Sequence, residues 1–246
     1  MLIRIYVKLL NGDAIMMRLD KIISSTGICS RREVRQIIKR ITVDGRPAKS
    51  SDEKVDPTAS TILIDGEPID YRTARYYMLN KPAGYISATE DRKEKTVMEL
   101  LPQQIRKIGL FPVGRLDKDA EGLLILTDDG DFAHRVMSPK SGIKKLYLVK
   151  TGLPFAEDDV KTFEDGIILG DGTKCLPAEL KIVDGGGLVT VREGKYHQVK
   201  RMCAAAGKPV EYLKRLKIGE LELDNTLKPG EFRELDKEEV LKIFNG

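Results

Sequence analysis

A charged loop at residues 114–122 contains the side chains best suited to chemistry. It reads Gly-Arg-Leu-Asp-Lys-Asp-Ala-Glu-Gly and is flanked on both sides by apolar runs that predict strands. Reactive residues commonly lie on loops held by a rigid scaffold, and this loop places candidate carboxylates, among them Asp117, beside the Arg115 guanidinium. A carboxylate can act as a nucleophile or as a base. Composition alone favours the alternative, a solvated charged turn.

A basic pair on a predicted helix is the second candidate group. Residues 198–206 have an apolar stripe that predicts a helix, and Gly207 is placed to end it. Lys200 and Arg201 are adjacent in this helix, and adjacent helical positions point about 100° apart. The two cations therefore face different surroundings, and a plain surface position is the alternative for both.

Tyr147 is the aromatic candidate, on a predicted strand at residues 145–150. Alternation places it on one face with Lys145 and Val149. A core position is the ordinary interpretation of such a tyrosine.

The composition describes a globular protein with a highly charged surface. Of its 246 residues 41% are hydrophobic and 33% are charged, with a net charge of +4, so the chain can bury one large core or two modest ones. Residues 31–49 hold seven basic against two acidic side chains, and residues 195–217 hold seven against one. Two basic patches predict a polyanionic partner that contacts the protein at two places. The alternative is that both patches are ordinary solvated surface.

Several classes of protein are disfavoured. Three widely spaced cysteines and two histidines predict neither a disulfide framework nor a metal site, and they suggest reduced cytoplasm. No apolar run approaches the roughly 20 residues needed to span a bilayer, so no membrane partner is expected. Gly185–Gly187 predicts a hairpin turn, and the absence of a following helix with Lys-Ser/Thr argues against a nucleotide site.

Residues 17–68 predict a small domain of two helices and a hairpin. Ser30-Arg31-Arg32-Glu33 is a capping box that opens the second helix. This helix leaves Lys39 and three arginines in solvent, and we call the three arginines the arginine face: Arg31, Arg32 and Arg35. Guanidinium groups suit phosphate oxygens, which favours RNA over a protein partner. Residues 1–16 are predicted to be an extension of unknown structure, and residues 69–75 a linker.

These motifs together resemble the RsuA-type ribosomal RNA pseudouridine synthases. The resemblance runs in motif order over residues 17–243. Its motifs are a module of the ribosomal protein S-four type, Leu-Asn-Lys-Pro-x-Gly at 79–84, Gly-Arg-Leu-Asp at 114–117, Lys-x-Tyr-x-Val at 145–149, His-Gln-Val-Lys-Arg-Met at 197–202 and Leu-x-Pro-Gly-Glu-Phe-Arg at 227–233.

The resemblance implies roles for the candidate residues. Asp117 is the catalytic residue, Lys200 is the cation paired with it, and Tyr147 lies on the target base. Lys81 and Arg201 are each expected to contact an RNA phosphate. Arg115 is expected either to fill the gap left by the flipped base or to hold the phosphate of that base. His197 is expected to make a structural hydrogen bond. The arginine face is the expected RNA anchor.

The implied fold is α+β. A small N-terminal helix-hairpin RNA-binding domain precedes the linker, and residues 76–243 form a larger catalytic domain on a mixed, mainly antiparallel sheet. The implied reaction breaks the C–N glycosidic bond of a uridine and rejoins the uracil through carbon, so no redox change occurs and no cofactor is expected. Whether Asp117 attacks the sugar or removes a proton from it stays open.

The Tyr-His-Gln-Val-Lys-Arg-Met segment is similar to the branch that modifies small-subunit RNA. This similarity implies 16S rRNA, at the uridine numbered 516 in that RNA, or a small-subunit assembly intermediate as partner of a monomeric enzyme. The alternatives are 23S rRNA and a non-catalytic, rRNA-binding assembly protein.

Overall fold

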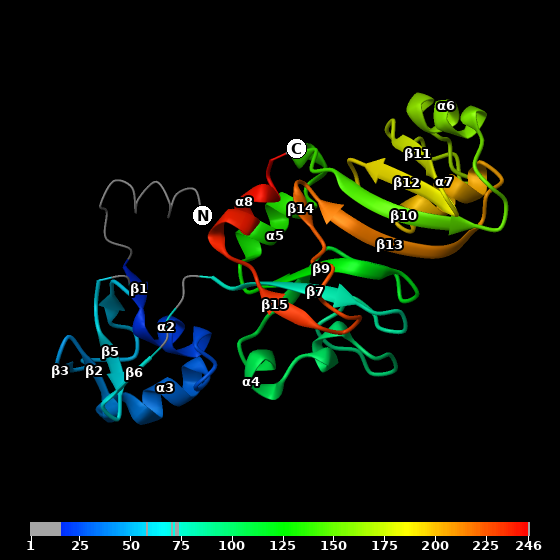
Figure 1. Ribbon diagram of the computed structural model, residues 1–246. Helices are drawn as coiled ribbons and strands as arrows, with labels where there is room; N and C mark the ends of the chain where they lie inside the picture. Colours follow the sequence, from blue (N-terminus) through cyan, green and yellow to red (C-terminus); the bar gives the residue numbers. More distant parts are fainter. Residues whose placement is uncertain (1–15, 58, 70, 72–73, 246) are drawn as a thin grey trace. The chain divides into compact units, whose positions relative to one another are not determined.

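The computed structural model describes residues 16–57, 59–69, 71 and 74–245. The extension predicted at residues 1–16 therefore lies outside the described residues, apart from Met16. The chain divides into two compact units, each described by itself (Figure 1). The first unit holds residues 1–75, 101–110 and 128–132, and the second holds the rest.

The first unit contains the two helices and the small sheet that its sequence predicts. Its elements are β1 (Met17–Arg18), α2 (Leu19–Ser25), α3 (Arg31–Ile37), β2 (Ile41–Val43), β3 (Arg46–Pro47), β4 (Lys54–Val55), β5 (Ile62–Ile64), β6 (Glu67–Pro68) and α4 (Gln103–Arg106). Four strands form one sheet in the order β3-β2-β5-β6, and β1 pairs with β4. The apolar side chains of α2 and of strands β2 and β5 are buried together in one core.

Local chemistry fixes the ends of these elements. The Ser30 side chain accepts from the Glu33 N–H, and the Glu33 carboxylate accepts from the Ser30 N–H at 2.7 Å, which confirms the capping box. Two hairpins turn through Asp-Gly pairs, Asp44-Gly45 and Asp65-Gly66, in which all four residues have positive φ. Such pairs are typical of tight turns whose twist matches that of the strands.

Residues 101–110 cluster with the first unit, although the sequence analysis placed them in the catalytic domain. The turn after α2 explains the difference. Gly27 has φ +77°, and a Cβ on it would lie 3.4 Å from Ile108 Cγ1 and 3.6 Å from the Gln104 carbonyl. The absence of a side chain at Gly27 thus lets the segment around α4 pack closely against this turn.

The second unit is built on a mixed, mainly antiparallel sheet, as predicted. Its strand order is β11-β12-β10-β13-β9-β7-β15, with β14 on β13 and β8 on β9. Only the pair β13–β9 is parallel among the described strand pairs of this sheet. The strands are β7 (Tyr76–Lys81), β8 (Phe111–Val113), β9 (Glu121–Thr127), β10 (Lys145–Thr151), β11 (Glu179–Val183), β12 (Gly186–Val191), β13 (Val210–Ile218), β14 (Leu221–Glu222) and β15 (Phe232–Glu234).

Helices accompany both ends of this sheet (Figure 1). They are α6 (Glu157–Asp165) beside β11, α7 (Gln198–Ala205), and α8 (Lys237–Lys242) beside β14. Helix α5 (Gly130–Met137) begins in the first unit and continues in the second. No helix among the described residues is long and apolar enough to cross a membrane.

Two glycine positions bring strands together around the site. At Gly122 in β9 a Cβ would lie 2.2 Å from the Arg215 carbonyl oxygen of β13, so only glycine allows the parallel pair to meet there. The turn predicted at Gly185–Gly187 is confirmed, but its last two glycines belong to β12. A Cβ on Gly186 would lie 2.1 Å from the Val149 carbonyl oxygen of β10, which explains why glycine occupies a strand position.

Candidate active site

A pocket of about 400 Å³ opens in the second unit. The loop between β8 and β9, residues 114–120, forms one wall, and the loop at residues 193–197 together with the start of α7 forms another. Strand β10 contributes Tyr147, and β13 contributes Arg215. Asp117, Tyr147, Arg115 and the segment before Lys200 are thereby brought to one place, although they come from distant parts of the sequence.

Hydrogen bonds from Gly84 and Ser87 hold the backbone of the loop that carries Asp117. The Ser87 hydroxyl donates to the Leu116 carbonyl and accepts from the Leu116 N–H, both at 3.0 Å. The Gly84 N–H donates to the Lys118 carbonyl at 2.7 Å. Hydrogen bonds on both sides of Asp117 fix its backbone, so the carboxylate is held in place before any ligand arrives.

Lys81 does not serve the role predicted for it. Its side chain is fully buried, and its ammonium donates to the carbonyls of Ala120 at 2.7 Å, Pro82 at 3.0 Å and Lys118 at 3.3 Å. Burial lowers its pKa to about 8, while nearby carboxylates, Asp119 first, raise it. Because its ammonium donates to three carbonyls inside the protein, Lys81 holds the loop that carries Asp117 and is not available to an RNA phosphate.

Asp117 faces two basic side chains from the start of α7. Lys200 Nζ lies 3.4 Å from Asp117 Oδ2, which is the predicted pair, and His197 Nε2 lies 3.3 Å from Asp117 Oδ1. The Asp117 side chain is 21% exposed, so it is accessible from the pocket without being fully solvated. The contact of His197 places this residue at the carboxylate itself.

Lys200 has a second carboxylate partner that the sequence analysis did not single out. Its Nζ lies 2.5 Å from Asp119 Oδ1, closer than to Asp117. The hydrogen bond from Lys200 lowers the pKa of the Asp119 carboxyl below its ordinary value, although partial burial opposes this. Lys200 therefore bridges two carboxylates of one loop, and the signal for it was the Asp-Lys-Asp spacing.

Tyr147 lies on the inward face of β10, as the alternation predicted, and only 8% of it is exposed. Its neighbour Arg215 was missed by sequence reasoning. Arg215 is 3% exposed, donates through Nε to the Leu123 carbonyl at 2.7 Å, and has Nη1 3.5 Å from the Tyr147 hydroxyl. Among the described residues its Nη2 has no hydrogen-bond partner. Alternate side chains of a strand share a face, so Arg215 lies on the same buried face of β13 as Leu213, two positions earlier. This alternation was the signal in the sequence that could have identified Arg215.

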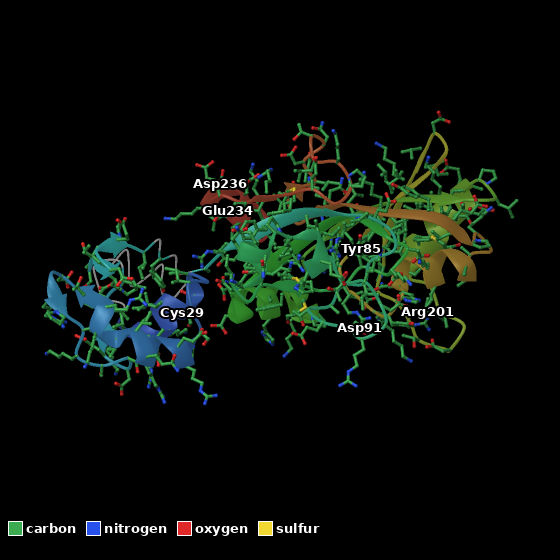
Figure 2. All side chains as sticks on the ribbon, turned by 90° about the horizontal axis from the view of Figure 1, so that it is seen from below. Cys29, Tyr85, Asp91, Arg201, Glu234 and Asp236 are labelled. Atoms are coloured by element: carbon green, nitrogen blue, oxygen red, sulfur yellow. The ribbon has the colours of Figure 1, made fainter. Side chains whose placement is uncertain are left out.

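The other predicted RNA contacts lie in several places. Arg115 is exposed on the pocket wall and has neither a hydrogen bond nor an ion pair within the described part of the chain. Arg201, labelled in Figure 2, forms an ion pair with Asp171 at 2.5 Å, whereas Lys200 contacts Asp117 and Asp119. The arginine face is exposed on α3 of the first unit. No group of three or more His, Cys, Asp or Glu residues that could hold a metal occurs within the described ranges.

Comparisons with known proteins agree with this arrangement. The S4 domain family matches residues 17–59, and the RNA pseudouridylate synthase family matches residues 75–205. An uncharacterized RNA pseudouridine synthase, YtzG of Bacillus subtilis, is 46% identical over 231 residues, 91% of this chain and 97% of the relative. The ribosomal small subunit pseudouridine synthase A of Yersinia pestis is 41% identical over 234 residues, 92% of this chain and 98% of the relative.

A solved structure agrees as well. The crystal structure of a pseudouridylate synthase superposes with a TM-score of 0.66 at 35% identity, covering 92% of this chain and 99% of that one. The fold and the two family matches together describe an enzyme that isomerises uridine in RNA and that carries an N-terminal S4 domain. The chain belongs to the RNA pseudouridine synthase family and is of the RsuA type.

Proposed function

We propose that this chain converts a uridine of 16S rRNA, the one numbered 516 in that RNA, to pseudouridine with Asp117 as the catalytic residue. The observation that carries the proposal is the Asp117 carboxylate in the pocket, 3.4 Å from Lys200 Nζ and 3.3 Å from His197 Nε2. The preference for 16S rRNA rests on relatives named ribosomal small subunit pseudouridine synthase A.

The chemistry needs an anion beside the ribose and room for a base to leave the stack. Asp117 acts on the sugar while the C–N bond breaks, and the freed uracil then turns so that carbon takes the place of nitrogen. Tyr147 covers the base from the β10 side, where an aromatic ring is a suitable wall for an extruded nucleobase. Lys200 places a cation 3.4 Å from the Asp117 carboxylate, where it attracts the negative charge that the reaction uses.

RNA binding is divided between the two units. The arginine face supplies phosphate contacts on the first unit, and Arg115 supplies one at the pocket. The substrate is 16S rRNA or an assembly intermediate that contains it, and the enzyme acts as a monomer in the cytoplasm.

Pseudouridine mapping of rRNA from cells with and without the gene tests the proposal. The expected result is the loss of one pseudouridine in 16S rRNA, restored by the wild-type gene and not by Asp117→Asn. Loss of a pseudouridine from 23S rRNA would transfer the assignment to the large subunit. An unchanged map in both RNAs would favour a binding protein without activity on rRNA.

A further inference from the structure

Tyr196 is the most exposed aromatic side chain of the described residues. It is 69% exposed, whereas the other described Phe and Tyr residues are buried or half-buried. It lies on the pocket rim in the loop before α7. Met137, 49% exposed, lines the same pocket. Two large apolar side chains left in water at the mouth of one pocket indicate a surface that a ligand covers.

The Tyr196 ring already takes part in a stack. Its centroid lies 3.8 Å from that of the His197 ring, and the two planes differ by 19°. The His197 ring is held at its far edge by Asp117, 3.3 Å from Nε2. One face of Tyr196 therefore lies against a ring that reaches the catalytic carboxylate, and its exposure leaves the other face open.

The loop that presents Tyr196 is rigidly built. Gln198 Nε2 donates to Glu193 Oε1 at 2.8 Å, and the Lys195 N–H donates to Gln198 Oε1 at 2.9 Å, so the two ends of the loop are bridged by buried side chains. The Glu193 carboxylate also accepts from Lys195 Nζ. His197 adopts φ +46°, a conformation uncommon for residues other than glycine and one that collects at functional sites.

The charge around this stack identifies the kind of ligand. Arg115 lines the same pocket and is exposed, with no partner among the described side chains. An open aromatic face and an unpaired guanidinium on the lining of one pocket fit a nucleotide, since the base stacks on the ring and the phosphate meets the cation. An apolar protein segment would leave Arg115 unpaired.

We propose that Tyr196, supported by His197, is a stacking platform for a base that flanks the target uridine. The inference rests on the proposed function, because it takes RNA as the substrate of this pocket. The flanking base lies on the outer face of Tyr196 while the target base occupies the pocket beside Tyr147. Loss of such a stack corresponds to about a 5- to 150-fold weakening of binding, from roughly 1–3 kcal/mol per base.

The absence of tryptophan from the chain makes a direct test possible. Tyr196→Trp keeps an aromatic platform and introduces a single tryptophan, whose emission is followed. Titration with unmodified 16S rRNA transcript is expected to quench its emission as binding saturates. Leu241→Trp, at an exposed position of α8 outside the pocket lining, is the matched control and is expected to keep its emission. Saturable binding without quenching at position 196 overturns the proposal.

Kinetics separate stacking from chemistry. Tyr196→Ala is expected to raise KM for the transcript 5- to 150-fold with kcat nearly unchanged, and Tyr196→Phe to restore the wild-type KM because the ring is retained. Abasic nucleotides beside the target, one on each side in turn, are expected to raise the wild-type KM at one position and leave Tyr196→Ala unaffected there. A loss confined to kcat, or equal losses with Ala and Phe, overturns the platform. Wild-type enzyme that binds RNA but turns over none instead contradicts the proposed function, and the quenching result still decides on stacking.

Discussion

Lys200 contacts two carboxylates, and the contacts predict different consequences for activity. Its Nζ lies 3.4 Å from Asp117 and 2.5 Å from Asp119. The side chains of Lys200 and Asp117 are 23% and 21% exposed, whereas that of Asp119 is 75% exposed. Because water screens an exposed pair, we expect the longer contact, with Asp117, to be the stronger one.

The magnitudes separate the two roles. Coulomb's law at 3.4 Å gives about 5 kcal/mol at an effective dielectric constant of about 20, and about half of that with doubled screening. An exposed ion pair such as Lys200–Asp119 contributes only about 0.2–1 kcal/mol. If Lys200 stabilises the Asp117 carboxylate during the reaction, Lys200→Met lowers kcat/KM by at least about 50-fold, whereas Asp119→Asn lowers it less than about fivefold.

Tritium release from rRNA that carries 5-tritiated uridine measures kcat/KM, and circular dichroism checks folding. The double variant completes a cycle: Lys200→Met should cost at least as much in the Asp119→Asn background as in the wild type. Equal losses in both single variants, with no further loss in the double variant, would mean that Lys200 acts through Asp119. That result would refute the reasoning.

Four other changes test separate parts of the molecule. Asp117→Asn should abolish tritium release, while thermal stability and RNA affinity stay near wild type. Tyr147→Phe should keep much of the turnover, because the aromatic ring remains. A strong loss of turnover with Phe would assign the Tyr147 hydroxyl to proton transfer. Replacing the arginine face by alanine should lower the slope of log Kd against log salt by about 2–3, and an unchanged slope would remove α3 from the RNA interface. Burial lowers the pKa of Lys81 from 10.5 to about 8, so between these values the unfolded chain binds more protons and the free energy of unfolding rises with pH. Lys81→Met should remove up to about 3 kcal/mol of that rise, measured by urea unfolding at pH 8 and pH 10.5, and an identical rise in the variant would contradict the burial argument.

Much of the fold and site was predictable because local chemistry specified it. The capping box at Ser30 and the apolar stripe that buries Met202 and Cys203 depend on neighbours within one or two turns. The divergence of Lys200 and Arg201 followed from helix geometry alone, and each now faces a different carboxylate. Patterns of this kind need no knowledge of what packs against the element.

The role of Lys81 could not be predicted, because its partners come from elsewhere in the chain. A lysine before Pro82 at a strand end is ordinarily exposed, since lysine is almost never fully buried without partners. Here two of the three carbonyls that accept from it belong to the loop that carries Asp117, those of Lys118 and Ala120. The same holds for Arg215, whose acceptor Leu123 lies on the parallel strand β9. Only the tertiary pairing of strands reveals these acceptors.

The partners of the cations around the pocket explain how one small region serves both structure and chemistry. Lys81 and Arg215 donate to backbone carbonyls, although Arg215 Nη2 has no hydrogen-bond partner among the described residues. Lys200 faces carboxylates, which cancel its charge. Lys81 and Arg215 thus hold the backbone around the pocket, whereas Lys200 contacts the carboxylate side chains of Asp117 and Asp119. Losing Lys81 should therefore displace the loop as a whole, whereas losing Lys200 should leave the loop in place and change only the charge that Asp117 meets.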